Sequence, residues 1–366
     1  MKNKHALIEQ LVKISSRGRR VEEIARELEE PVDKIQALLE SKPRMPEGFL
    51  LTSWKDHLGM TYWQVLAPEA PPPKIEPRAY RYVRSKDEAY HRVFIPDDIV
   101  DENGRPAKYI ELFPFSDVHY GHRRCDKGNF MRDVKEVARR PNRYGFLNGD
   151  NMEMSLGDSA GGAAWAEQDL TPEEQREKSE HIYRPIAHKL IVARTGNHDG
   201  RPGRNGSGMN PLKEVCKSLG GIPYFNGPSN MDVIWRGYSW SFFMKHGTGS
   251  SNTAGGKLNT AGRDRGFTDF RNFFIMGHVH DEMSHKVVRK VRRRVYDADG
   301  KLQRFWEEEL REYKVICPSY LLYSGTYAEE AGYSPGSRNT IVIQLFASGD
   351  YRVVSSKRGQ NTVLAI

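Results

Sequence analysis

The sequence of 366 residues predicts an α/β protein, in which a small helical domain of winged-helix type precedes a larger layered domain. After residue 79, short apolar runs of strand length alternate with segments of helical periodicity, as is typical of layered α/β folds. Before residue 67, apolar residues recur mainly at helical spacing, and the proline-rich segment APEAPPPKIEP follows. We therefore expect a helical domain over 1–66, a linker over 67–78 and the layered domain over 79–366.

The first 66 residues have the pattern of a helix-turn-helix unit followed by a hairpin. Apolar residues at helical spacing predict helices within 4–42, with a break at the segment EEP. Two further runs, FLLTSW and MTYWQVL, predict a wing of two strands. The candidate reading helix VDKIQALLESK has few basic residues, so direct DNA contact and a role in dimerisation or protein docking both stay open.

Composition limits the partners and the compartment. A formal net charge of +8 and a pI of about 9.2 favour an anionic partner such as nucleic acid. The first residues lack the apolar core of a signal peptide, and no run approaches the length of a membrane span. Three widely spaced cysteines, Cys125, Cys216 and Cys317, predict reduced thiols. We therefore expect a cytoplasmic protein without membrane contact, and a homo-oligomer is possible.

Helix signals are clearest at three places in the layered domain. Apolar residues at helical spacing predict helices within 125–140, 170–190 and 210–221. The second segment has Thr171 as N-cap, Pro172 at the first helical position and Glu174 three residues after the cap, which together predict a capping box. The third segment begins with Asn210 as N-cap. These signals predict where the last two helices begin.

Five apolar runs predict strands, and a polar segment follows each of them. The run KYIELFPF precedes Asp117 and His119; RYGFLN precedes Asp150; KLIVAR precedes Asn197, His198 and Asp199; YSWSFFM precedes His246; and NFFIM precedes His278 and His280. Because the carboxyl ends of strands in an α/β sheet meet at one edge, where ligands bind, we expect these side chains to form one site.

The residue types in this predicted site are those of metal ligands. Carboxylate, imidazole and amide groups together suit divalent cations such as Mn, Fe, Zn or Ni, of which we expect Mn. The predicted site has more such side chains than one tetrahedral ion can bind, and seven ligands fit two ions that share a carboxylate. Two ions about 3.5–4 Å apart can hold a phosphoryl group and activate a bridging hydroxide.

The ordered motifs DxH, GDN, GNHD, H and GHxH resemble those of the calcineurin-like metallophosphoesterase family, over about residues 105 to 350. The resemblance implies a β-sandwich flanked by helices. It implies that one ion binds Asp117, His119 and His280, that the other binds Asn197, His246 and His278, and that Asp150 bridges both. It also implies that His198 protonates or stabilises the leaving oxygen and that Asp199 orients His198.

Departures from the family pattern narrow the range of substrate classes. Serine/threonine phosphatases of this family carry an arginine soon after the GD motif, whereas this chain continues as GDNMEMSLGD. In having an acidic residue, Glu153, at this point, the chain resembles the nuclease and general phosphodiesterase branches, although those often have Asp there. We therefore expect a phosphodiesterase that acts on DNA or another nucleic acid. The alternatives are a phosphomonoesterase or small-nucleotide phosphodiesterase, and a DNA-binding regulatory protein with an idle phosphoesterase domain.

Two further features have more than one interpretation. His122 lies beside the first cluster, where it either contacts substrate or serves only the structure. The segment HKVVRKVRRRVYDADGKLQRFWEEELREYKV predicts a long hairpin with one basic and one acidic arm. Cross-strand charge pairing explains this pattern, and a cationic strip for a nucleic acid backbone is the alternative.

Overall fold

The protein is described by a computed structural model that forms two compact units, Met1–Pro73 and Lys74–Ile366. Each unit is described here by itself. The predicted linker over 67–78 falls mostly outside the described residues. The structure describes residues 4–14, 19–43, 45–46, 50–55, 60–66, 74–84, 90–157, 165–204, 208–249, 251, 253–263, 270–296, 299–322, 339–357 and 363–365.

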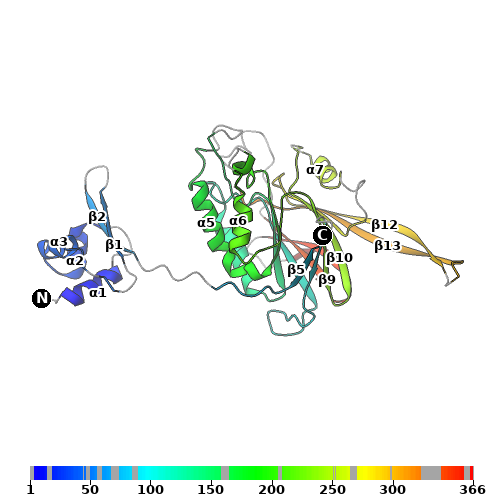
Figure 1. The fold of residues 1–366 in the computed structure, drawn as a ribbon, viewed down its shortest axis with the longest axis horizontal. Helices are drawn as coiled ribbons and strands as arrows, with labels where there is room; N and C mark the ends of the chain where they lie inside the picture. The colour runs from blue at the N-terminus through cyan, green and yellow to red at the C-terminus, as the bar shows by residue number, and fades with distance from the viewer. Residues whose placement is uncertain are drawn as a thin grey trace. The chain divides into compact units, whose positions relative to one another are not determined.

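The first unit contains three helices and a two-stranded antiparallel sheet among its described residues (Figure 1). Their bounds are α1 (Lys4–Ile14), α2 (Val21–Leu28), α3 (Val32–Glu40), β1 (Leu50–Lys55) and β2 (Thr61–Leu66). Apolar side chains from all three helices and from β2, among them Leu11, Ile24, Leu39 and Val65, form its core. These are the elements expected from the sequence, while the assignment as a winged helix stays a prediction.

The second unit contains two mixed sheets, each with seven strands among the described residues. In spatial order, the first sheet consists of β12 (Met283–Tyr296), β13 (Leu302–Ile316), β11 (Phe273–Met276), β10 (Tyr238–Lys245), β9 (Ser229–Trp235), β4 (Tyr90–Phe94) and β3 (Arg81–Arg84). The second sheet consists of β16 (Val363–Ala365), β15 (Tyr351–Lys357), β14 (Asn339–Phe346), β5 (Tyr109–Phe115), β6 (Arg143–Asn148), β7 (Leu190–Arg194) and β8 (Tyr224–Phe225). The expected α/β class is therefore confirmed.

The two sheets share one hydrophobic core. Ile110 and Leu112 of β5 join Val233, Trp240 and Phe242 of the first sheet in a single buried cluster. Alternate residues of a strand point to opposite faces of its sheet, so the apolar side chains on the other face of β5 must pack against further elements. Each large apolar side chain buried in this way contributes roughly 1.5–3 kcal/mol.

Helices cover the other face of the second sheet. Phe113 and Phe115 of β5 pack there with Phe130, Tyr183 and Val215, which come from three different helices. The helices of this unit are α4 (Lys127–Arg139), α5 (Pro172–Tyr183), the 3-10 helix η1 (Arg184–Lys189), α6 (Pro211–Ser218) and α7 (Ala254–Ala261). The capping box of α5 and the Asn210 cap of α6 form as the sequence predicts. Among the described residues, no helix is both long and apolar enough to cross a membrane.

Parallel pairing aligns the strand ends that carry the polar segments. In the second sheet β5, β6 and β7 run parallel to one another, and in the first sheet β10 runs parallel to β11. These five strands are the five apolar runs expected from the sequence. The loops that follow them contain the candidate ligands.

The long hairpin is formed by β12 and β13, which pair antiparallel. Arg289 Nη2 lies 3.5 Å from Glu312 Oε2, and Lys290 Nζ lies 3.9 Å from Glu309 Oε1. These pairs support the interpretation of cross-strand charge pairing in the described part of the ribbon.

Candidate metal centre

Residues from five loops converge at one site beyond the ends of β5, β6, β7, β10 and β11. Three overlapping groups of side chains each bring their ligand atoms within 4.8 Å of one another. The first group is Asp117, His119 and His280, the second is His119, Asp150 and His198, and the third is Asp150, His246 and His278. The chain thus assembles side chains that are up to 163 positions apart in the sequence, from 117 to 280.

The distances between donor atoms suit the coordination of metal ions. His246 Nε2 lies 2.9 Å from Asp150 Oδ2 and 3.0 Å from Asn197 Oδ1, which in turn lies 3.0 Å from His278 Nδ1. Ligands held about 2.1 Å from one ion are separated by roughly 3.0–3.4 Å around it. This part of the site therefore has the spacing of a coordination shell.

A second set of donors consists of Asp117, His119 and His280. His119 Nε2 is 3.1 Å from His280 Nε2, and His280 Nε2 is 3.5 Å from Asp117 Oδ1. Asp117 Oδ1 also lies 3.9 Å from His246 Nε2, which links the two sets. Two imidazole nitrogens that face each other next to a carboxylate require a proton or a cation between them.

The backbone at these ligands adopts an uncommon conformation. Asp117, His119, Asp150, His278 and His280 have positive φ angles between 49° and 69°. Such angles cost non-glycine residues on the order of 1–3 kcal/mol each, and they persist where the surrounding structure enforces them. Here the N–H of Asp117 donates to the carbonyl of Gly149 at 3.0 Å, and the N–H of His119 donates to that of Asp150 at 2.9 Å. Strain concentrated at five polar residues indicates a functional site.

Two glycines let the loops approach the ligands. A Cβ atom on Gly196 would overlap the carboxylate and the backbone nitrogen of Asp150, and one on Gly149 would overlap the His246 ring. Gly149 also has a φ of 89°, which side chains with a Cβ rarely adopt. The glycines of the GD and GN motifs therefore make room for the loop that faces them.

The electrostatics of the site favour positive charge. Burial alone would raise the pKa of Asp150, but the imidazoles of His246 and His198 hold it well below its usual range. Burial lowers the pKa of His246, while Asp150 and Asp117 raise it to about 9. Burial and the neighbouring His198 lower the pKa of His119 to about 4, which leaves its ring neutral at pH 7. Ionised carboxylates beside a neutral imidazole are the donor chemistry that a divalent cation requires.

His198 lies beside the ligands and contacts Glu153 and Arg201. Its backbone N–H donates to Asp150 Oδ1 at 2.7 Å, and its Nδ1 lies 3.1 Å from both the carbonyl and Oε1 of Glu153. Arg201 Nη2 lies 3.0 Å from His198 Nε2. A guanidinium only donates, so Nε2 accepts this bond and Nδ1 carries the proton directed to Glu153.

Glu153 connects several parts of the site, a role that the sequence did not indicate. Its carboxylate lies 2.7 Å from His119 Nδ1, accepts from Ser155 Oγ at 2.7 Å, and accepts from Arg201 Nη1 at 3.0 Å. Burial would raise its pKa, but the His198 and His119 rings hold it well below its usual range. A charged Glu153 therefore orients both histidine rings, as a carboxylate behind a metal-binding imidazole commonly does.

Asp199 differs from its expected role. Its carboxylate accepts backbone N–H groups from Met152 at 2.9 Å, Gly196 at 3.1 Å and Asn151 at 3.3 Å. It therefore joins the loop after β6 to the loop after β7, and Glu153 supplies the side-chain contact to His198 that the resemblance assigned to Asp199. Burial and the charge of Asp150 raise the pKa of Asp199 to about 6.

His122 contacts other parts of the protein through both of its ring nitrogens. The Nδ1 atom of His122 accepts the N–H of Arg124 at 3.0 Å, and its Nε2 lies 3.0 Å from Glu167 Oε2. Both of its ring nitrogens thus have protein partners, which favours the structural interpretation. Arg201 was not predicted from the sequence. Its position three residues after His198 is the signal that could have indicated its contact with the His198 ring.

No protein-family model matches the chain, and neither does any curated protein. Among solved structures, the crystal structure of Pseudomonas putida nuclease MPE is similar with a TM-score of 0.24 and 14% sequence identity. The alignment covers 81% of this chain and 96% of the nuclease.

Proposed function

We propose that the protein is a phosphoester hydrolase that uses two divalent metal ions, of which Mn is the expected species, and cleaves phosphodiester bonds of nucleic acid. The observation that carries this proposal is the convergence of polar side chains from five strand ends near the buried carboxylate of Asp150, seven of which are candidate ligands. The net charge of +8 supports an anionic substrate.

The donor set divides between two ions around a shared carboxylate. Asp117, His119 and His280 would hold the first ion. The second would be held by Asn197, His246 and His278, and Asp150 would contact both. When bound, such ions act as Lewis acids toward a phosphoryl group and lower the pKa of a water molecule.

The protein side chains beside the ligands would handle the leaving group. His198 reaches the edge of the ligand cluster and would donate a proton to the departing oxygen. Glu153 fixes the orientation of the ring through Nδ1. Arg201, which now donates to His198 Nε2, has further N–H groups for a phosphate oxygen and would stabilise charge there. A protonated His198 cannot accept from Arg201, so proton uptake by the ring would free Nη2 of Arg201 for the substrate, while Nη1 stays bound to Glu153 and Ser155.

Removal of metal tests the proposal directly. Exhaustive chelation is expected to abolish hydrolysis of bis-p-nitrophenyl phosphate and of single-stranded DNA, and Mn is expected to restore both. Elemental analysis of the reloaded protein should give two ions per chain, and anomalous scattering should place them at the ligand cluster. Full activity in protein that contains no metal would refute the proposed function. A p-nitrophenyl phosphate assay in parallel distinguishes a monoesterase.

We further propose that the first unit tethers the enzyme to nucleic acid. It has its own core and contains none of the candidate ligands. A chain that begins at Lys74 is therefore expected to hydrolyse bis-p-nitrophenyl phosphate as the full chain does. Its KM for long DNA should rise, and its loss of DNA affinity with salt should be shallower, because fewer phosphate contacts remain. Equal DNA affinities and salt slopes for the two chains would favour a dimerisation or docking role, which sedimentation can measure.

A further inference from the structure

We propose that an apolar cavity beside the metal centre is a substrate subsite that holds a planar, uncharged ring, such as an unstacked nucleobase, attached to the phosphoester. This inference rests on the proposed function and extends it to the part of the substrate that the metal ligands do not contact.

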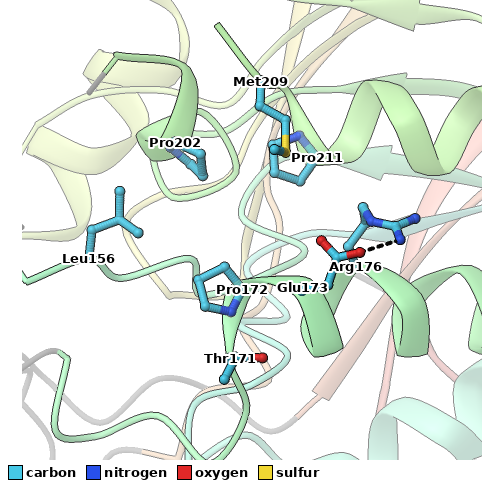
Figure 2. Close-up of a pocket in the computed structure, with 8 residues that line it drawn as sticks. All are labelled: Leu156, Thr171, Pro172, Glu173, Arg176, Pro202, Met209 and Pro211. Carbon is cyan, nitrogen blue, oxygen red and sulfur yellow. Dashed lines mark hydrogen bonds and ion pairs between the residues drawn. The ribbon is translucent and has the colours of Figure 1, made fainter. Parts of the chain in front are cut away.

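The cavity has a volume of about 410 Å³, which lies within the roughly 300–1,000 Å³ of small-molecule sites. Figure 2 shows the side chains around it, which come from the loop after β6, the start of α5, the segment between β7 and α6, and the start of α6. Five of the lining residues are apolar: Leu156, Pro172, Pro202, Met209 and Pro211. Met209 is 48% exposed, so its side chain is accessible to a ligand in the cavity.

Two chain segments contribute both to the lining of the cavity and to the contacts around His198 and Glu153. Arg201 Nη1 donates to Ser155 Oγ at 2.6 Å, and Arg201 Nη2 lies 3.0 Å from His198 Nε2. Leu156 and Pro202, which line the cavity, are the next residues after Ser155 and Arg201. Consecutive Cα atoms are about 3.8 Å apart. The inferred subsite requires the substituent of a phosphate at His198 and Arg201 to extend toward Leu156 and Pro202.

The chemistry of the lining selects the occupant. The polar groups include Arg176 and Glu173, which bind each other at 2.6 Å across the α5 surface, as the dashed line in Figure 2 marks. The guanidinium of Arg176 is therefore already paired with Glu173. The cavity thus has little positive charge with which to bind a second phosphate. Three proline rings and a methionine thioether instead provide apolar surface, and sulfur makes favourable contacts with aromatic rings. A ring without charge fits this lining better than a sugar-phosphate backbone.

A pair of substrates that share a leaving group measures the subsite. Thymidine 5′-p-nitrophenyl phosphate carries a nucleoside on the phosphate, and methyl p-nitrophenyl phosphate carries a methyl group. We expect kcat/KM to be at least about tenfold higher for the thymidine ester, in keeping with the discrimination of apolar pockets. Met209→Lys should bring this ratio close to one, whereas Met209→Leu should retain it. Both rates come from one preparation, so the ratio does not depend on the folded fraction of a variant.

The matched control is Val288→Lys. Val288 is 50% exposed on β12 and does not line the cavity, so this substitution should leave both rates unchanged. A ratio near one in the wild-type protein, or a ratio that Met209→Lys does not lower, overturns the subsite while hydrolysis of both esters upholds the proposed function. If neither ester is hydrolysed with metal present, the proposed function fails and the subsite fails with it.

Cleavage of a single-stranded oligonucleotide identifies the source of the ring. A loss in Met209→Lys for both the thymidine ester and the oligonucleotide supports a base from a nucleic acid strand. A loss for the thymidine ester alone supports the same subsite in an enzyme for small nucleotides.

Discussion

Asp150→Asn is expected to release both metal ions and to lower phosphodiester hydrolysis by about 10³-fold or more. Asp150 is buried, and its two carboxylate oxygens have different partners: Oδ1 accepts the N–H of His198, and Oδ2 lies 2.9 Å from His246 Nε2. Asparagine has nearly the same shape but no charge. The variant therefore keeps the packing of the loop and loses the negative charge that holds cations at the centre of the cluster.

Two measurements separate this effect from general damage to the fold. Metal content by elemental analysis should fall from two ions to fewer than one, while the circular dichroism spectrum stays that of the wild type. Asp232→Asn is the matched control, because Asp232 accepts from Tyr90 on β4 and belongs to none of the ligand groups. This control should keep both ions and normal turnover. Two bound ions and wild-type turnover in Asp150→Asn would show that the carboxylate does not bridge.

Local signals explain which parts of the fold the sequence could predict. The start of α5 was predictable because Thr171 and Glu174 each accept the backbone N–H of the other, and Pro172 has no N–H that needs a partner. The five strands were predictable because their apolar runs are short and end in polar residues. The strand ends meet at one edge because the strands pair in parallel. In α/β folds ligands bind at this edge, so the location of the site was predictable without knowledge of any tertiary contact.

The contacts behind the ligands could not be predicted in this way. Asp199 and Glu153 are both acidic residues near candidate ligands, and nothing in the local sequence distinguishes their roles. Their roles depend on how the loop after β6 faces the loop after β7. In the fold, Asp199 accepts two backbone N–H groups of the loop after β6 and one of its own loop, and Glu153 reaches His119, His198 and Arg201. Such partners are set by tertiary packing, which the sequence pattern alone does not contain.

His198→Ala is expected to retain both metal ions and to lower turnover by about 10²–10⁴-fold when the leaving group is an alkoxide or a nucleoside. The ring lies beside the ligand cluster, and its orientation is fixed by Glu153 through Nδ1. The loss should be much smaller for bis-p-nitrophenyl phosphate, because p-nitrophenolate is a stable anion and leaves without a proton. A ratio of the two losses well above one is the result that assigns proton donation to His198.

The comparison needs a histidine control and a test of the neighbouring arginine. His181 is exposed on α5 and belongs to none of the ligand groups, so His181→Ala should leave both rates unchanged. If His198→Ala loses the same factor on both substrates, the ring stabilises transition-state charge and does not donate a proton. Arg201→Gln then becomes the informative variant, because a guanidinium that binds phosphate oxygen lowers the barrier for every leaving group alike. Equal losses in Arg201→Gln together with unequal losses in His198→Ala would divide the two tasks between these adjacent side chains.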